Sequence, residues 1–264
     1  MHDDHDGGLA HDLPRLITRR RALGTVTGGL GLLLVGCGSS EDRAVATATP
    51  TTTTSGDTAA VPEETAGPYP GDGSNGPNVL SESGVVRRDI TTSFGDASGE
   101  AEGVATTLEL TLLDVAGGGG PLAGAAVYVW HCDRAGRYSL YDGDVASENY
   151  LRGVQESDGD GKLAFETIFP AAYSGRWPHI HFEVYESLDA ATAASTKLRT
   201  SQIALPADVC ERVFATSGYE QSVQNLGATS LESDMVFSDG YAGQLAKASG
   251  DVEAGITLAL NVGV

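Results

Sequence analysis

The sequence has few basic residues for its length. Its 264 residues include 16 Lys and Arg against 36 Asp and Glu, which gives a formal net charge of -20. Such a surface repels nucleic acids and anionic lipid headgroups, so we expect no nucleic-acid partner and no electrostatic binding to membranes. The acidity is sufficiently explained by solubility and does not identify a substrate.

Long hydrophobic runs are also scarce. The apolar, Gly-rich run at residues 23–36 is too short for a spanning helix and is typical of a signal peptide. It follows RRR at residues 19–21, which is typical of twin-arginine signals, and it ends in LVGC at residues 34–37. This ending resembles the lipobox of bacterial lipoproteins. We therefore expect a signal peptide at residues 1–37, lipidation of Cys37, and an exported protein anchored by lipid on the extracytoplasmic face of the membrane. An ordinary signal peptide with a chance cysteine is the alternative.

Cysteine is rare, with three in the chain. Beyond Cys37 only Cys132 and Cys210 remain. An even pair outside the cytoplasm favours a disulfide, so we predict a Cys132–Cys210 bridge, with two buried thiols as the alternative.

The remaining chain divides into a tether and a folded domain. Residues 38–61 are rich in Thr, Ala and Ser with little apolar surface to bury, which predicts a flexible tether. From residue 62 to 264, short segments with period-two alternation are separated by Gly- and Pro-rich turns. The pattern predicts strands at residues 107–115, 125–130, 163–168, 180–185, 200–205 and 256–262. Short helical stretches are expected near residues 206–215 and 242–248. The expected fold is mostly β and sandwich-like.

Histidine is scarce as well, yet two of the six lie one residue apart in RWPHIHFEV, residues 176–184. In a strand, His179 and His181 point to the same face with Cα atoms about 6.6 Å apart. Their imidazoles can therefore reach one metal ion, although a packed pair is as common. A cupin would add a glutamate ligand, but Glu186 falls on the opposite strand face and the glycines typical of cupins are missing.

Several further motifs accompany this pair in a fixed order. They are TAGPY at residues 65–69, WHCDRAGRYS at 130–139, SDGDG at 157–161, TIFPAAY at 167–173, RWPHIH at 176–181 and SQI at 201–203. Their order, spacing and residue types resemble the intradiol ring-cleavage dioxygenases, the family of catechol and protocatechuate dioxygenases, in its short, exported, lipoprotein-like branch. The resemblance covers about residues 62–264. It implies a β-sandwich of immunoglobulin- or transthyretin-like topology with short helices and long loops.

The resemblance also implies one non-haem iron(III) per chain, held by Tyr138, Tyr173, His179 and His181. Iron(III) is a hard trication that favours anionic oxygen ligands, and it removes the phenolic proton that a free tyrosine keeps up to a pKa near 10. Two phenolates and a hydroxide neutralise the ion, which makes a buried charged site tolerable. Tyr141 and Tyr150 lie nearby, but only Tyr138 stands in the G-x-Y-S context.

Three roles follow from the same resemblance. Tyr173 would be the ligand that the substrate displaces, Arg176 would stabilise negative charge on the substrate ring, and Gln202 would support the site. A solvated arginine is the alternative for Arg176. His131 is interpreted as structural.

The implied activity is an oxidoreductase reaction. A catechol-type aromatic is cleaved by O2 between its two hydroxylated carbons to give a cis,cis-muconate-type product. A non-catalytic ligand- or metal-binding lipoprotein on the same sandwich, and a copper or cupin-type oxidase, are the alternatives. Arg137 and Arg152 are candidates to bind a substrate carboxylate, or they are surface charges.

Overall fold

A computed structural model describes residues 59–264, which lie in one compact unit. The predicted signal peptide, the lipidation of Cys37 and most of the tether lie outside the described residues. Within the described part, Ala60 pairs with Gly263, and Val61 is buried and donates its backbone N–H to the Gly263 carbonyl at 3.0 Å. These two residues of the predicted tether are therefore part of the folded domain. No helix among residues 59–264 is long and apolar enough to cross a membrane.

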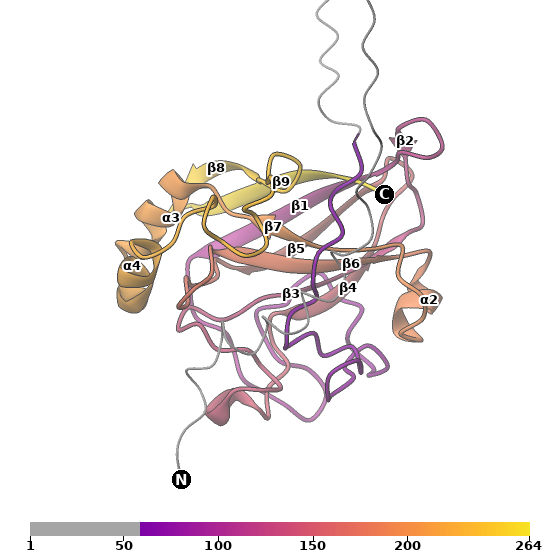
Figure 1. Ribbon diagram of the computed structural model, residues 1–264. Helices are drawn as coiled ribbons and strands as arrows, with labels where there is room; N and C mark the ends of the chain where they lie inside the picture. The colour runs from indigo at the N-terminus through magenta and orange to yellow at the C-terminus, as the bar shows by residue number, and fades with distance from the viewer. Residues whose placement is uncertain (1–58) are drawn as a thin grey trace, which may run out of the picture. The chain divides into compact units, whose positions relative to one another are not determined.

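Two β-sheets pack against each other (Figure 1). The first contains β2 (Gly120–Pro121), β1 (Ala105–Asp114), β9 (Gly255–Gly263) and β8 (Lys247–Asp251) in that order, with β5 (Lys162–Ile168) also paired to β1. The second has the order β4 (Arg152–Glu156), β3 (Ala126–Trp130), β6 (His179–Tyr185) and β7 (Arg199–Ala204). Only β1 and β9 run parallel among these ladders. The prediction of a mostly β sandwich is confirmed.

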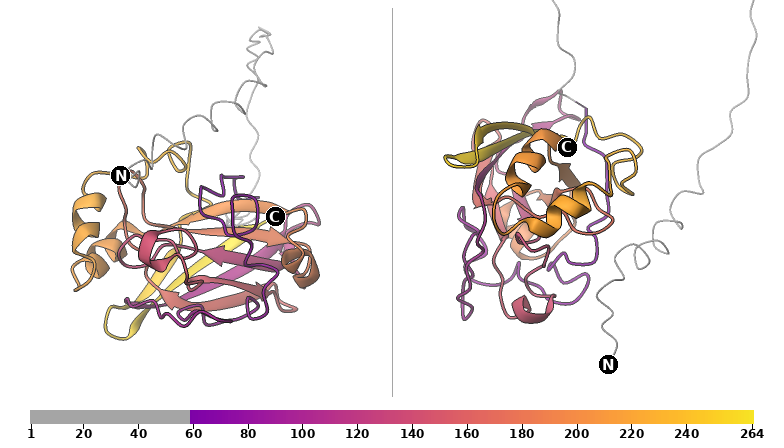
Figure 2. Two further views of the ribbon diagram at one scale, coloured as in Figure 1. Left: turned by 90° about the horizontal axis from the view of Figure 1, so that it is seen from below. Right: turned by 90° about the vertical axis from the view of Figure 1, so that its left-hand side faces the viewer.

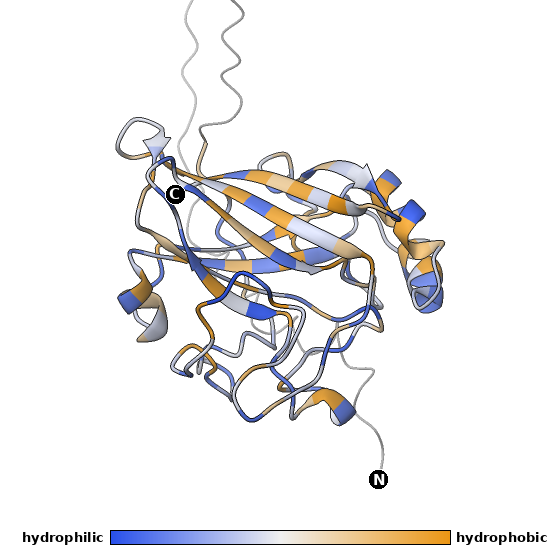
Figure 3. Ribbon diagram, turned by 180° about the vertical axis from the view of Figure 1, so that it is seen from behind, coloured by the Kyte–Doolittle hydropathy of each residue, from blue (hydrophilic) through white to orange (hydrophobic). Residues whose placement is uncertain are grey.

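The main hydrophobic core lies between the two sheets. Strand β1 alternates buried leucines with more exposed polar residues, as a strand with one buried face requires (Figure 3). Leu108 of β1, Phe165 of β5 and Leu258 of β9 pack in one cluster with Val129 of β3 and Phe182 of β6. Burial of each such side chain contributes about 1.5–3 kcal/mol, so this layer holds the sheets together.

The second sheet is covered on its other face as well. All seven residues of β6 are buried. Ile180 and Phe182 point into the core between the sheets, so His179 and His181 point to the opposite face. Long loops from residues 59–101 and 131–151, seen below β3 and β4 in Figure 1 and edge-on in Figure 2, cover that face. The histidine pair therefore lies between a sheet and a layer of loops.

Four short helical segments complete the described part: the 3₁₀ helix η2 (Gly143–Val145), α2 (Leu188–Thr192), α3 (Ala207–Phe214) and α4 (Glu220–Leu226). The six predicted strands and the helix near residues 206–215 are confirmed. The prediction of a helix near residues 242–248 is wrong. Leu245 forms a β-bridge with Ala204 of β7, and β8, which begins at Lys247, pairs with β9. Sheet pairing here overrides a local helix preference.

The predicted Cys132–Cys210 disulfide is wrong, since both thiols are free and buried. Cys132 packs among the loops on the outer face of the second sheet, with its Sγ 3.7 Å from the Ala171 carbonyl oxygen. Cys210 on α3 packs in the core between the sheets. Burial raises the pKa of both thiols, so each behaves as a small apolar side chain.

The contribution of the core can be tested with two leucines. Leu258 is fully buried on β9, whereas Leu198 is 43% exposed. We expect Leu258→Ala to lower the free energy of unfolding by about 2–5 kcal/mol, because it leaves a cavity between the sheets. Leu198→Ala is the matched control, with a change within about 0.5 kcal/mol in urea denaturation. Equal effects of the two substitutions would contradict this account of the core.

Candidate metal centre

Two tyrosines and two histidines from three segments meet on the outer face of the second sheet. The Tyr138 and Tyr173 hydroxyl oxygens are 3.5 Å apart, and the Tyr173 hydroxyl lies 3.2 Å from His179 Nε2. The Nε2 atoms of His179 and His181 are 3.1 Å apart. The structure thus brings together all four residues that the sequence predicted as ligands.

The strand and its neighbours fix the orientation of the two imidazoles. His179 Nδ1 donates to the Trp177 carbonyl oxygen at 2.5 Å, which leaves its Nε2 lone pair facing the cluster. His181 stacks on Trp130 of the adjacent strand, with ring centroids 4.9 Å apart and planes 7° apart. The His181 Nδ1 atom is buried without a hydrogen-bond partner among the described residues, so ring stacking orients it instead.

Burial keeps all four donors neutral when no cation is bound. It lowers the pKa of His179 to about 3, with Arg176 adding to the effect, and lowers the pKa of His181 well below its usual value. Burial raises the pKa of Tyr173 to about 12 and that of Tyr138 well above its usual value. The centre therefore offers two imidazole lone pairs and two phenolic oxygens, which become anionic when a multivalent cation displaces their protons.

This donor set fits iron(III). A hard trication favours phenolate oxygen, and neutral imidazole is a common ligand for iron. No group of three or more His, Cys, Asp or Glu side chains suited to a metal occurs in residues 59–264, and Glu186 is exposed. The described residues therefore offer no three-ligand set of the cupin type.

Arg176 and Gln202 lie beside this cluster. Arg176 is buried and donates from Nη2 to Gln202 Oε1 at 2.6 Å, so it is not a solvated arginine. Gln202 in turn donates from Nε2 to the Thr65 carbonyl oxygen at 2.9 Å. Sequence reasoning missed a further partner, the fully buried Asp234, which accepts from Arg176 Nε at 2.9 Å.

The loops over the cluster are held by one buried guanidinium, that of Arg152 on β4. It donates to the carbonyl oxygens of Tyr69, Pro70 and Ser139, and also to the hydroxyls of Ser139 and Tyr128. The interpretation of Arg152 as a surface charge is therefore wrong, and its donors are engaged by the protein itself. Because the rings of Tyr69 and Tyr138 contact each other, with centroids 4.9 Å apart and planes tilted by 34°, this anchoring also fixes the surroundings of Tyr138.

The other sequence-predicted residues have separate structural roles. Arg137, which is partly exposed, pairs with Asp133 and Asp144. His131 lies buried, with Nδ1 at 2.8 Å from the Cys132 carbonyl oxygen and Nε2 at 2.7 Å from Thr167 Oγ1. Its interpretation as structural agrees with these contacts.

Comparisons with known proteins agree with this fold and cluster. The family model described as Dioxygenase (Dioxygenase_C) matches residues 75–208, just over half of the chain. The chain belongs to the intradiol ring-cleavage dioxygenase family.

Individual relatives are distant. A stretch of 56 residues is 39% identical to catechol 1,2-dioxygenase 2 of Acinetobacter lwoffii and covers 21% of this chain and 20% of that protein. The match thus spans about a fifth of the curated relative. The solved intradiol ring-cleavage dioxygenase from Tetranychus urticae has a TM-score of 0.62 at 23% identity, covering 78% of this chain and 94% of that chain. This likeness shows a shared fold.

The anchoring by Arg152 predicts a large effect of a conservative substitution. We expect Arg152→Lys to lower the free energy of unfolding by about 3 kcal/mol or more, because lysine cannot reach the several buried oxygens that the planar guanidinium satisfies. Arg88→Lys, at an exposed pair with Glu166, is the control and changes it by less than about 0.5 kcal/mol. Urea denaturation measures both, and a small loss for Arg152→Lys would contradict the anchoring.

A second prediction concerns Gly67, which approaches His181. A Cβ at Gly67 would lie 3.2 Å from His181 Cε1, and the backbone φ is +70°. Gly95 has almost the same φ, +69°, but no atom within 4 Å of that position. We expect Gly67→Ala and Gly95→Ala to cost a similar backbone strain of about 1–2 kcal/mol each. Only Gly67→Ala should shift the ring nitrogen resonances of His181 in ¹H–¹⁵N spectra, and equal spectra would contradict the close approach.

Proposed function

We propose that the protein is a non-haem iron(III) intradiol dioxygenase that cleaves catechol-type aromatics between the two hydroxylated carbons. Both atoms of O2 enter the product, a cis,cis-muconate-type dicarboxylic acid. The observation that carries the proposal is the convergence of two phenolic oxygens and two imidazole nitrogens in a buried cluster, in which successive donor atoms from Tyr138 through Tyr173 and His179 to His181 lie 3.1–3.5 Å apart. Family membership supports the same reaction class.

The proposed ligands are Tyr138, Tyr173, His179 and His181. When bound, iron(III) supplies a Lewis-acidic centre for the two catechol oxygens and accepts electron density from the ring. Tyr173 is the more exposed of the two tyrosines, so it is the ligand that a catechol would replace. Its phenolate oxygen can then accept one of the two catechol protons.

The surrounding residues supply orientation and charge. On this proposal Arg176 stabilises negative charge that develops on the ring. Its support is the contact with Gln202, which links it to the segment at residues 65–69. Tyr69 and Tyr138 add aromatic surface against which a flat ring can pack. Water exclusion by these side chains strengthens each electrostatic contact.

We also propose export and lipid anchoring through Cys37. The support is the sequence RRR, the apolar run and LVGC within residues 19–37. On this proposal the enzyme meets aromatic compounds outside the cytoplasm.

The visible spectrum of the purified protein, loaded with iron(III), tests the proposal. We expect about one iron per chain and a broad tyrosinate-to-iron band that moves to lower energy when catechol is added without oxygen. Tyr173→Phe should alter the band and lower the rate of oxygen uptake with catechol at least about 100-fold. This loss exceeds the roughly 10- to 100-fold loss that is typical when a residue hydrogen-bonded to a metal ligand is replaced. Tyr141→Phe, outside the cluster, is the matched control and should keep both.

A colourless protein that takes up no iron would contradict the proposal. A coloured protein that binds catechols without consuming oxygen would instead favour the non-catalytic binding protein. Oxygen uptake over a panel that includes catechol, hydroxyquinol and protocatechuate would identify the substrate.

A further inference from the structure

Asp234 lies outside the residues matched by the family model and within the segment at residues 227–246, between α4 and β8. We propose that Asp234 is a positioning residue that holds the guanidinium of Arg176 in the orientation needed beside the diol site. The role in turnover rests on the proposed function. The positioning itself is a property of the protein alone.

The geometry of the pair fixes the guanidinium plane. Asp234 Oδ2 accepts from Arg176 Nε at 2.9 Å, and Oδ1 lies 3.4 Å from Nη2. Nη2 also donates to Gln202 Oε1 at 2.6 Å. Because the group is planar, fixing Nε and Nη2 also fixes the direction of Nη1. Nη1 is the guanidinium nitrogen that forms no hydrogen bond within the described part of the chain.

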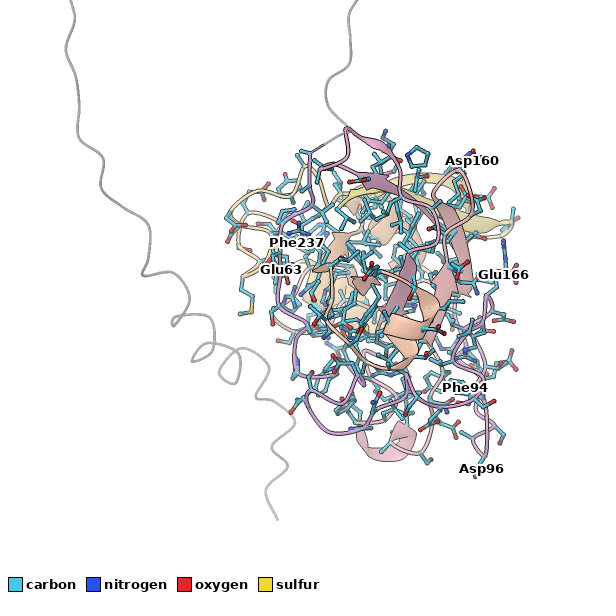
Figure 4. All side chains as sticks on the ribbon, turned by 90° about the vertical axis from the view of Figure 1, so that its right-hand side faces the viewer. Glu63, Phe94, Asp96, Asp160, Glu166 and Phe237 are labelled. Atoms are coloured by element: carbon cyan, nitrogen blue, oxygen red, sulfur yellow. The ribbon has the colours of Figure 1, made fainter. Side chains whose placement is uncertain are left out.

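The carboxylate is itself held firmly. Asp234 is completely buried and accepts backbone N–H groups from Trp177 at 2.7 Å, Val236 at 2.8 Å and Phe237 at 3.3 Å. Val236 and Phe237 pack with Trp177 in a separate hydrophobic cluster, which docks the loop beside the centre. In Figure 4 the labelled Phe237 lies on the same side of the view as Glu63, which precedes the 65–69 segment. Because backbone N–H groups hold both of its oxygens, the carboxylate cannot reorient when the arginine side chain moves. The carboxylate therefore sets the orientation of the arginine.

The same carboxylate supports one of the proposed ligands. Asp234 holds the N–H of Trp177, and the Trp177 carbonyl oxygen accepts from His179 Nδ1. One side chain thus contacts both Arg176 and the residue whose carbonyl orients His179, and an asparagine at this position keeps an oxygen that can accept the Trp177 N–H. Such partners behind a ligand commonly change activity 10- to 100-fold when removed.

Burial makes the pair interdependent. Arg176 and Asp234 side chains are 8% and 0% exposed. A charge at that depth is costly without its partner, so each requires the other. An asparagine at position 234 keeps one acceptor oxygen but removes the negative charge, so within residues 59–264 the guanidinium keeps only neutral hydrogen-bond partners.

The test uses Asp234→Asn, which keeps the size and removes the charge, with Glu232→Gln as the matched control. Glu232 is an exposed carboxylate in the same loop that accepts from the Tyr241 hydroxyl. In metal-free protein labelled with ¹⁵N-arginine, the Arg176 Nε–H should exchange slowly with water in the wild type and in Glu232→Gln. Asp234→Asn should accelerate this exchange about 10- to 100-fold, as loss of a charge-assisted hydrogen bond implies. Unchanged exchange would overturn the positioning role.

Kinetics of the iron-loaded enzyme test the link to turnover. We expect Asp234→Asn to lower kcat about 10- to 100-fold while it keeps the iron content and the tyrosinate band. In an Arg176→Ala background, Asp234→Asn should have less than about a threefold further effect on kcat. Arg176→Lys replaces Arg176→Ala if the latter does not fold.

Two outcomes distinguish the hypotheses. If Asp234→Asn lowers kcat by the same roughly 10- to 100-fold in the wild type and in the Arg176→Ala variant, Asp234 does not act through Arg176. An iron-loaded wild type that shows no tyrosinate band and no catechol binding would refute the proposed function, and the exchange of Arg176 Nε–H in the metal-free protein would still decide the positioning role.

Discussion

Burial of β6 on both faces is the constraint on which the rest of the structure depends. A strand covered on both sides is usually apolar throughout, but β6 alternates apolar residues with His179, His181 and Glu183. Buried polar groups require partners. Glu183 finds Lys197 and the Tyr185 hydroxyl, and His179 finds the Trp177 carbonyl. The apolar face joins the two sheets, and the polar face requires a covering layer that can satisfy it.

That covering layer is made of loops, which lack the regular hydrogen bonds of a sheet. Buried backbone carbonyls in loops must find other donors. Arg152 supplies several at once, to Tyr69, Pro70 and Ser139, and Asp133 similarly accepts the N–H groups of residues 135 and 137. On this face, hydrogen bonds from charged side chains therefore replace the backbone hydrogen bonds that a sheet would supply. These side-chain hydrogen bonds hold the loops that position Tyr138 near the two histidines.

The sequence allowed prediction of whatever is encoded locally. Six strands followed from period-two alternation, and the four donors followed from the resemblance of the motifs to those of the intradiol dioxygenases. Strands β4 (RGVQE) and β8 (KASGD) carry few apolar residues, so no period-two apolar pattern predicted them. The role of Arg152 was wrongly predicted, and Asp234 was missed, for a different reason: their partners lie up to 83 and 58 residues away in the chain. Such contacts depend on how loops fold back, and an arginine or aspartate gives no local signal of them.

The charges around the centre are paired although the chain as a whole is strongly acidic. Arg176 is paired with Asp234, and Lys197 with Asp72 and Glu183. Exposed charges farther than about 8 Å are largely screened at physiological ionic strength, so these local pairs determine the field at the centre. A guanidinium compensated by a carboxylate carries little net charge, yet its N–H groups keep their direction. On the proposed function, Arg176 would act on a bound ring through its oriented N–H donors more than through its positive charge.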